Sequence, residues 1–178
     1  MADAAQSSPL LPGRDCGSCT MCCKVLAIEA LGKPMGKWCA QCAIGSGCRI
    51  YAERPRECRD YYCAYLTWPD VADYWWPSKS KMVLDVDPSG EWLRAHVDPA
   101  RPDAWKVEPY LSQLKRWASG ADGGPGQVLV LIDTRAIVIL PDRVIDLGVV
   151  GPDETIVTEQ RPTTRGTVIV HAYKTKKS

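Results

Sequence analysis

The sequence has no phenylalanine, only two histidines, and no cysteine after Cys63 in a chain of 178 residues. His96 and His171 each lie in a predicted strand, far along the chain from the cysteines, and we expect both to be structural. A Cys–His nucleophile therefore has no support. No serine lies in a G-x-S-x-G context, and the glycine-rich loop at 120–126 lacks the lysine of a phosphate-binding loop. No catalytic residue is assigned, and whether the protein is an enzyme stays open.

Strong charge and long apolar runs are also missing. The formal net charge is +1, which gives no electrostatic reason to expect a nucleic acid or an anionic membrane as partner. No stretch approaches the roughly 18 apolar residues of a membrane helix. Residues 1–14 lack the basic and apolar regions of an export signal, so we predict a disordered leader there. The expected compartment is the cytoplasm, where thiols stay reduced and clustered cysteines indicate metal or redox chemistry.

With phenylalanine absent, seven tryptophans and seven tyrosines supply the aromatic side chains, and eight of these lie between Tyr51 and Trp76. Buried Trp and Tyr side chains need partners for their polar atoms. We interpret this aromatic run as a collar packed over the cysteine region. An ordinary half-buried surface is the alternative.

The confinement of cysteine to the first part of the chain divides the sequence in two. We predict a cysteine-cluster metal-binding domain at 15–68, irregular and stapled by metal, with short helices such as one at about 54–64. We predict an appended α+β region at 69–178, a small antiparallel sheet with one helix. Its expected elements are a hairpin of 81–86 and 91–97, a helix at 110–118 ended by Gly120, a hairpin of 127–132 and 135–140, and strands at 143–150, 155–157 and 167–173. Asp85, Asp87 and Asp98 are interpreted as acids in turns.

The cysteine spacing carries the functional prediction. A C-x2-C pair places two sulfurs on one side of a tight turn, where both can bind one ion. Three such pairs, at 16/19, 19/22 and 39/42, fall within the segment from 16 to 63. Repetition of this kind disfavours ordinary buried thiols and disulfides, and the odd total disfavours a fully paired framework. The predicted metal ligands are Cys16, Cys19, Cys22, Cys23, Cys39, Cys42, Cys48, Cys58 and Cys63.

The number of cysteines limits the stoichiometry but does not identify the metal. Two four-thiolate zinc sites leave one cysteine spare, one four-iron cluster leaves five, and three ions with bridging thiolates use all nine. Cys22 and Cys23 are adjacent, and we expect their side chains to diverge and serve two neighbouring ions; the alternative is that one binds a metal and the other remains a reactive thiol. Cys16, Cys19 and Cys22 match the first three positions of the bacterial ferredoxin run, whose fourth element is absent.

Four arginines lie around Cys48 and Cys58 and can offset thiolate charge. They are Arg49, Arg54, Arg56 and Arg59. Among them we expect Arg59, beside Cys58, to hydrogen-bond the metal-bound sulfurs. A solvated helix face is the alternative.

The cysteine segment resembles a known family. The run Cys-Gly-Ser-Cys-Thr-Met-Cys-Cys at 16–23 matches a C-x-x-C-x-x-C-C signature, and Cys48-Arg49-Ile50-Tyr51, Arg54-Pro55 and Cys58-Arg59 match its second part. These elements are similar to the bacterial YkgJ-type cysteine-cluster family, described as zinc- or iron-chelating. The resemblance covers about 16–66. It implies that Cys16, Cys19, Cys22, Cys23, Cys48 and Cys58 are ligands, with Cys39 preferred to Cys42 as the intermediate one.

Three hypotheses follow from the sequence. The first is a cytoplasmic protein that binds zinc, as two or more ions, in all-thiolate sites. The second is an iron–sulfur oxidoreductase or electron-transfer component, because iron and zinc share soft thiolate ligands. The third is an adaptor in which zinc folds the first half and the sheet binds an unidentified protein.

Overall fold

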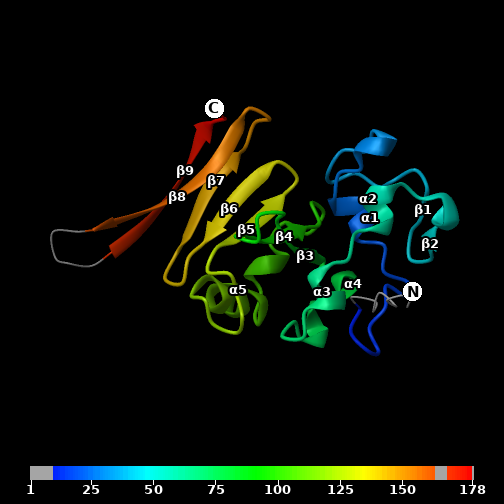
Figure 1. Ribbon diagram of the computed structural model, residues 1–178, viewed down its shortest axis with the longest axis horizontal. Coiled ribbons are helices and arrows are strands. Elements are labelled where there is room, and N and C mark those ends of the chain that lie inside the picture. Colours follow the sequence, from blue (N-terminus) through cyan, green and yellow to red (C-terminus); the bar gives the residue numbers. More distant parts are fainter. Residues whose placement is uncertain (1–9, 163–167, 178) are drawn as a thin grey trace, which may run out of the picture.

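The computed structural model describes residues 10–162 and 168–177. The chain runs from a cysteine-rich half with little regular structure into a mixed sheet and ends in a long hairpin (Figure 1). The cysteine-rich half contains α1 (Cys22–Val25), η1 (Glu29–Leu31), β1 (Cys42–Ala43), β2 (Gly47–Cys48), η2 (Tyr51–Glu53), α2 (Arg56–Arg59) and α3 (Ala64–Thr67). The remainder contains η3 (Asp73–Trp75), α4 (Pro77–Ser80), β3 (Met82–Val86), β4 (Leu93–Val97), η4 (Ala104–Lys106), α5 (Tyr110–Ala118), β5 (Val128–Ile132), β6 (Arg135–Ile139), β7 (Val144–Val149), β8 (Glu154–Pro162) and β9 (Val168–Lys176).

The α+β class is confirmed, but the central sheet is mixed and not purely antiparallel. Its strand order is β3-β4-β5-β6-β7, and the β4–β5 pair is parallel while the other three pairs are antiparallel. Parallel neighbours need a crossover of a dozen or more residues. The segment from Asp98 to Gln127 supplies it and contains α5, so β4, α5 and β5 form a β-α-β unit that the prediction of two separate hairpins overlooked.

Most predicted elements of the second half are present. The helix at Tyr110–Ala118 and both hairpins are confirmed. The strand predicted at 155–157 is part of the nine-residue β8, which pairs with β9. The predicted start of the last strand, at 167, lies outside the described residues. The helix predicted at 54–64 is instead two four-residue helices, α2 and α3, separated by residues 60–63, of which Cys63 is extended.

The two faces of the sheet have different covers. On one face, alternate residues of β3 to β6 pack with α5 and the segment from Ala64 to Trp75 into the largest apolar cluster, in which Trp75 and Trp117 are about 1% exposed or less. On the other face, β5 to β7 pack against β8 and β9, while Val83 of β3 packs against Met21 and Val25 from the cysteine-rich half. That half therefore covers only one edge of the second face.

The aromatic collar was not predicted correctly. Trp68 stacks on Trp117 at a ring separation of 5.4 Å, and Trp75 lies against Trp117 at 5.2 Å. Tyr65 and Tyr74 pack onto the same core. The sheet and α5 expose a broad apolar face that large rings cover well, and the cysteine region offers no such area. Tyr65, Trp68, Tyr74 and Trp75 thus belong to the core of the second half, whereas Tyr61 packs beside Cys19 and Cys63, and Tyr51 and Tyr62 are exposed.

The boundaries of the parts are less sharp than the sequence indicates. Ala64 lies before the predicted boundary at 68 but belongs to the core of the sheet. Of the predicted disordered leader, 1–9 lie outside the described residues. The following residues are held in place, because the Leu11 N–H donates to the Leu66 carbonyl at 2.8 Å and Arg14 donates to the Tyr65 carbonyl at 2.8 Å.

Candidate metal-binding cysteines

Two tight turns present the first C-x2-C elements. The Cys19 N–H donates to the Cys16 carbonyl at 2.7 Å, and Gly17 inside this turn has a φ of 46°, a left-handed conformation that glycine adopts without strain. Helix α1 follows at once and carries Cys22 and Cys23. The first four cysteines therefore project from a turn and one helical turn.

The second C-x2-C element is docked on α1. The Cys39 N–H donates to the Cys23 carbonyl at 2.9 Å, and the Cys42 N–H donates to the Cys39 carbonyl at 3.0 Å. Strands β1 and β2 then pair Cys42 with Cys48. Backbone hydrogen bonds thus bring cysteines from 23 to 48 into one region.

The nine cysteines fall into two neighbourhoods. Cys19 and Cys63 pack beside Met21, Val25 and Val83, and Cys16 is their electrostatic neighbour. We name Cys16, Cys19 and Cys63 the first thiol group. Cys23, Cys39, Cys42 and Cys58 pack with Ile28 and Trp38, and Cys48 is an electrostatic neighbour of Cys58. We name Cys23, Cys39, Cys42, Cys48 and Cys58 the second thiol group.

Cys22 and Cys23 do not diverge as expected. The Cys23 thiol is hydrogen-bonded to the thiols of both Cys22 and Cys42. The hydrogen bond with Cys22, reinforced by burial, raises the pKa of Cys23 far above its ordinary value. Cys22 lies between the two groups, because it is also an electrostatic neighbour of Tyr61 beside Cys63.

Burial raises the pKa of several of these cysteines further above neutral pH. It raises the pKa of Cys42 to about 11, with the neighbouring Cys23 adding to the effect. It also raises the pKa of Cys63 to about 11 and raises those of Cys16 and Cys58. All nine side chains are free thiols, with Cys39 and Cys42 only 7% exposed and Cys16 at the surface. Binding of a metal must therefore displace protons.

The thiols are gathered but are not arranged around a metal position. Within 10–162 and 168–177, no three His, Cys, Asp or Glu side chains are placed so that they could hold a metal ion. The thiols contact one another in pairs, such as Cys23 with Cys42, and otherwise pack in the two apolar clusters described above. The backbone brings all nine predicted ligands to one part of the molecule without closing them into sites.

Lys33 is a residue that the sequence analysis missed. It is 7% exposed, and its ammonium donates to the carbonyl oxygens of Lys24, at 2.8 Å, and Leu26. In the described part of the chain no carboxylate forms a salt bridge with it, and the anionic groups that act on it are Cys23, Cys39, Cys22 and Cys58. Burial lowers its pKa, and thiolate charge would raise it. The sequence gives little warning, because a lysine before a proline is ordinary in a surface loop.

Arg54, and not Arg59, is the arginine whose charge acts on a thiol. The Arg54 guanidinium stacks on Tyr51 at 4.0 Å, and its charge lowers the pKa of Cys16, which is nevertheless raised by burial. Its Nε is buried without a hydrogen-bond partner among the described residues. Arg59 is exposed at the end of α2. Arg56, at the start of the same helix, forms an ion pair with Asp60 at 2.8 Å. The short helix turns Arg59 outward, and this explains the difference.

A polar network joins the cysteine-rich half to the sheet. The Tyr61 hydroxyl donates to Asp85 at 3.3 Å, and Asp85 also accepts from Arg94 at 2.7 Å and contacts His96 at 3.2 Å. Asp85 is thus a buried strand residue and not an acid in a turn. Asp98 is likewise buried and pairs with Lys24 of α1 at 2.5 Å. Asp87 has the expected role, accepting backbone N–H groups of its own turn, and Asp98 also accepts the Ala100 N–H in the turn that it begins, at 2.9 Å.

His96 is a buried strand residue whose Nε2 contacts the Asp85 carboxylate at 3.2 Å, which agrees with a structural role, and its register partner Val83 packs beside the first thiol group. His171 pairs with Glu159 across the β8–β9 hairpin and is exposed. Neither histidine adds a ligand to the cysteines.

Comparison with known proteins adds no family to this description. No family model, no curated protein and no solved structure matches the chain. The similarity to the YkgJ-type signature therefore stays a prediction from the motif, and the function has to be inferred from the residues themselves.

Proposed function

We propose that this protein binds metal ions, with zinc as the first candidate, through thiolates of its cysteine-rich half. The donor set supports the proposal. Nine cysteines occupy the segment from 16 to 63, and all of them are free. Soft thiolates are preferred ligands of zinc and of iron–sulfur centres. The chain is expected to work in a reducing compartment such as the cytoplasm, where such thiols stay available.

Lys33 is the observation that carries the proposal. An ammonium is stabilised in the protein interior only when an anion or several acceptors compensate for lost water. Lys33 has two carbonyl acceptors, and the groups around it that can become anionic are cysteines. A zinc with four thiolates carries a net charge of −2, so a buried cation beside it would be stabilising. Neutral thiols offer Lys33 no such compensation.

The two thiol groups indicate at least two ions. The first group (Cys16, Cys19, Cys63) and the second group (Cys23, Cys39, Cys42, Cys48, Cys58) occupy different apolar clusters. Cys22 lies where it can serve either group. We expect each group to hold its own ion. Adjacent ions would share Cys22 or Cys23.

The open arrangement is compatible with this function because metal binding commonly completes the fold of a cysteine-rich segment. The helices of this half are three or four residues long, so loops carry most of the ligands. The thiols would lose their protons as they bind, and affinity should therefore rise with pH.

The direct test is elemental analysis, with an absorption spectrum, of the full chain purified without oxygen. Two or three zinc ions per chain and no visible band are expected. The triple variant Cys16→Ser/Cys19→Ser/Cys63→Ser and the triple variant Cys23→Ser/Cys39→Ser/Cys42→Ser should each lose part of the metal, and not the same part. Finding iron with a matching amount of acid-labile sulfide, in place of zinc, would identify the centre as an iron–sulfur cluster. Metal binding itself would be refuted if the purified protein held no metal and its thiols reacted with a thiol reagent as fast in the folded chain as in the unfolded chain.

A further inference from the structure

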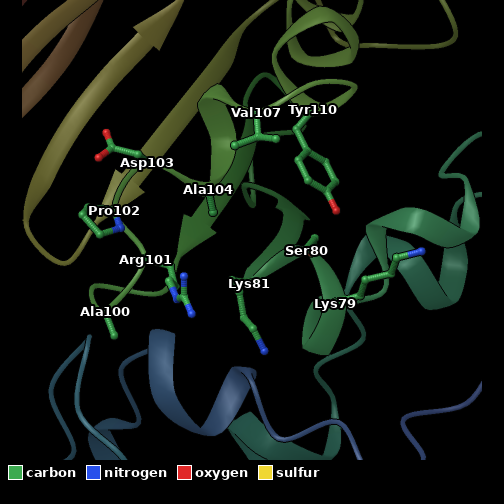
Figure 2. A pocket seen from close by; sticks show the side chains of 10 residues that line it. All are labelled: Lys79, Ser80, Lys81, Ala100, Arg101, Pro102, Asp103, Ala104, Val107 and Tyr110. Carbon is green, nitrogen blue, oxygen red and sulfur yellow. The ribbon is translucent and has the colours of Figure 1, made fainter.

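A hollow lies on the sheet-bearing half of the molecule, next to the loop that Asp98 connects to Lys24 of α1. It has a volume of about 550 Å³ and is bounded by the end of α4, the loop after β4, and the start of α5 (Figure 2). Hollows of roughly 300–1,000 Å³ are the usual size for small-molecule sites. Lys79, Lys81 and Arg101 line it on one side, and Val107 and Tyr110 on another.

The lining is basic without compensation. Asp103 is the carboxylate in the lining, and it pairs with Lys106 at 2.7 Å. Asp98, next to the loop, forms an ion pair with Lys24 and accepts a hydrogen bond from the Ala100 N–H. Lys79 and Arg101 make no side-chain hydrogen bond or ion pair with any described residue. Because the whole chain carries a net charge of only +1, this concentration of cations is local.

Lys81 is held in an uncommon backbone conformation. It ends α4 with a φ of 62°, in the left-handed region where glycine or asparagine is usual. Its ammonium donates to the Ser78 carbonyl at 2.5 Å. Figure 2 shows Lys81 and Arg101 extending in the same direction from two separate segments, while Lys79 extends away from both. A strained lysine where glycine would be relaxed points to a function of its side chain.

The opposite wall is apolar. Val107 is 58% exposed although it is aliphatic, and the ring of Tyr110 is fixed because its hydroxyl donates to the Tyr74 carbonyl at 3.1 Å. Ala104 completes this side. A ligand that fits both walls has an oxyanion at one end and a flat or apolar group at the other.

We propose that this hollow binds a small organic oxyanion, a phosphate ester or a carboxylate, with Lys81 and Arg101 holding the anionic group. An arginine fork and a lysine ammonium together match the charge and geometry of such a group. Tyr110 and Val107 would pack on the organic part. This site goes beyond the proposed metal binding and does not depend on it.

The test is titration of the purified full chain, followed by NMR or calorimetry, with phenyl phosphate, benzoate and inorganic phosphate as separate probes. We expect phenyl phosphate or benzoate to bind saturably and inorganic phosphate to bind more weakly. The organic probe with the higher affinity identifies the anionic group of the ligand. Lys81→Gly and Arg101→Gln should weaken binding by roughly tenfold or more, the usual effect of losing a charged contact. Lys176→Gln is the matched control, because Lys176 is exposed on β9 and lies outside the hollow.

Lys81→Gly also guards against loss of folding, since glycine relieves the left-handed backbone. Its melting temperature should be at least that of the wild type while its affinity falls. The proposal is overturned if no probe binds saturably up to about 10 mM, a concentration that detects even very weak complexes. It is equally overturned if Lys81→Gly and Arg101→Gln bind as tightly as Lys176→Gln.

Discussion

Replacement of Lys33 by methionine separates a metal-thiolate centre from a set of neutral thiols. Lys33→Met keeps the length and apolar stem of the side chain and removes the buried charge. In the metal-free protein it removes two hydrogen bonds, to the carbonyls of Lys24 and Leu26, and also the penalty of burying an ammonium. These effects oppose each other, so we expect the free energy of unfolding to change by no more than about 1 kcal/mol.

With metal bound, the same replacement removes an attraction. Two unit charges about 6 Å apart interact by roughly 3 kcal/mol at an effective dielectric constant near 20. A loss of about 2 to 3 kcal/mol corresponds to a metal affinity weakened roughly 30- to 150-fold. Lys33→Met should therefore be nearly neutral without metal and strongly unfavourable with it.

The assay is competition for zinc against a chromophoric chelator without oxygen, together with urea unfolding of the metal-free chain. Lys37→Met is the matched control, because Lys37 is exposed four residues further along the same segment. Equal zinc affinities for the wild type, Lys33→Met and Lys37→Met would refute the idea that Lys33 balances thiolate charge. A large loss of stability for Lys33→Met without metal would assign Lys33 a purely structural role.

Further substitutions test the fold. Burial raises the pKa of Asp85, but the hydrogen bonds and charges of His96 and Arg94 lower it more, so the pKa lies below its ordinary value of 3.8. The stability that this carboxylate contributes is therefore complete above pH 3.8 and is lost as the pH falls through the lower folded-state pKa. Asp85→Asn should therefore unfold more easily by about 3 kcal/mol at pH 7 and differ less and less from the wild type in urea titrations towards pH 2, whereas a constant difference would contradict this assignment. Gly124→Ala would place a Cβ 2.5 Å from the Cα and carbonyl oxygen of Trp117, so we expect a loss of about 1–3 kcal/mol or more in urea unfolding. Gly151→Ala, whose nearest neighbour is a carboxylate oxygen of the Asp153 side chain at 3.1 Å, should be nearly neutral, and equal effects of the two changes would show that contact with the Trp117 backbone is unimportant.

The second half of the chain could largely be predicted because its signals are local. Alternating apolar residues, a helical spacing ended by Gly120 and the turn at 87–90 each act over a few residues. The parallel pairing of β4 with β5 was missed because it depends on where a thirty-residue crossover returns the chain, and the sequence pattern of two hairpins looks complete without it. The misplaced aromatic collar has the same cause: burial of Trp68 and Trp75 depends on Trp117, more than forty residues away.

For the candidate site, spacing identified the cysteines but not their surroundings. Ligand spacing follows from the geometry of tight turns, which is local. Arg54 was one of the four arginines expected around the cysteines, but the sequence favoured Arg59. Lys33 lies near the thiols because the segment after α1 folds back and its ammonium meets the Lys24 and Leu26 carbonyls, an arrangement that no short motif records. The same holds for Thr20, which is 5% exposed and accepts a hydrogen bond from the Gly45 N–H at 3.2 Å beside Cys42.

Polar contacts join the segments that carry the cysteines to the central sheet. Helix α1 carries Cys22 and Cys23, and its Lys24 pairs with Asp98 at the end of β4. Tyr61, two residues before Cys63, donates to Asp85 on β3. A movement of α1 or of the Cys63 segment as thiols close on an ion would change the geometry of these two contacts. Asp98 also holds the loop that carries Arg101. The Lys24–Asp98 ion pair therefore connects the helix that carries Cys22 and Cys23 to the loop that carries Arg101.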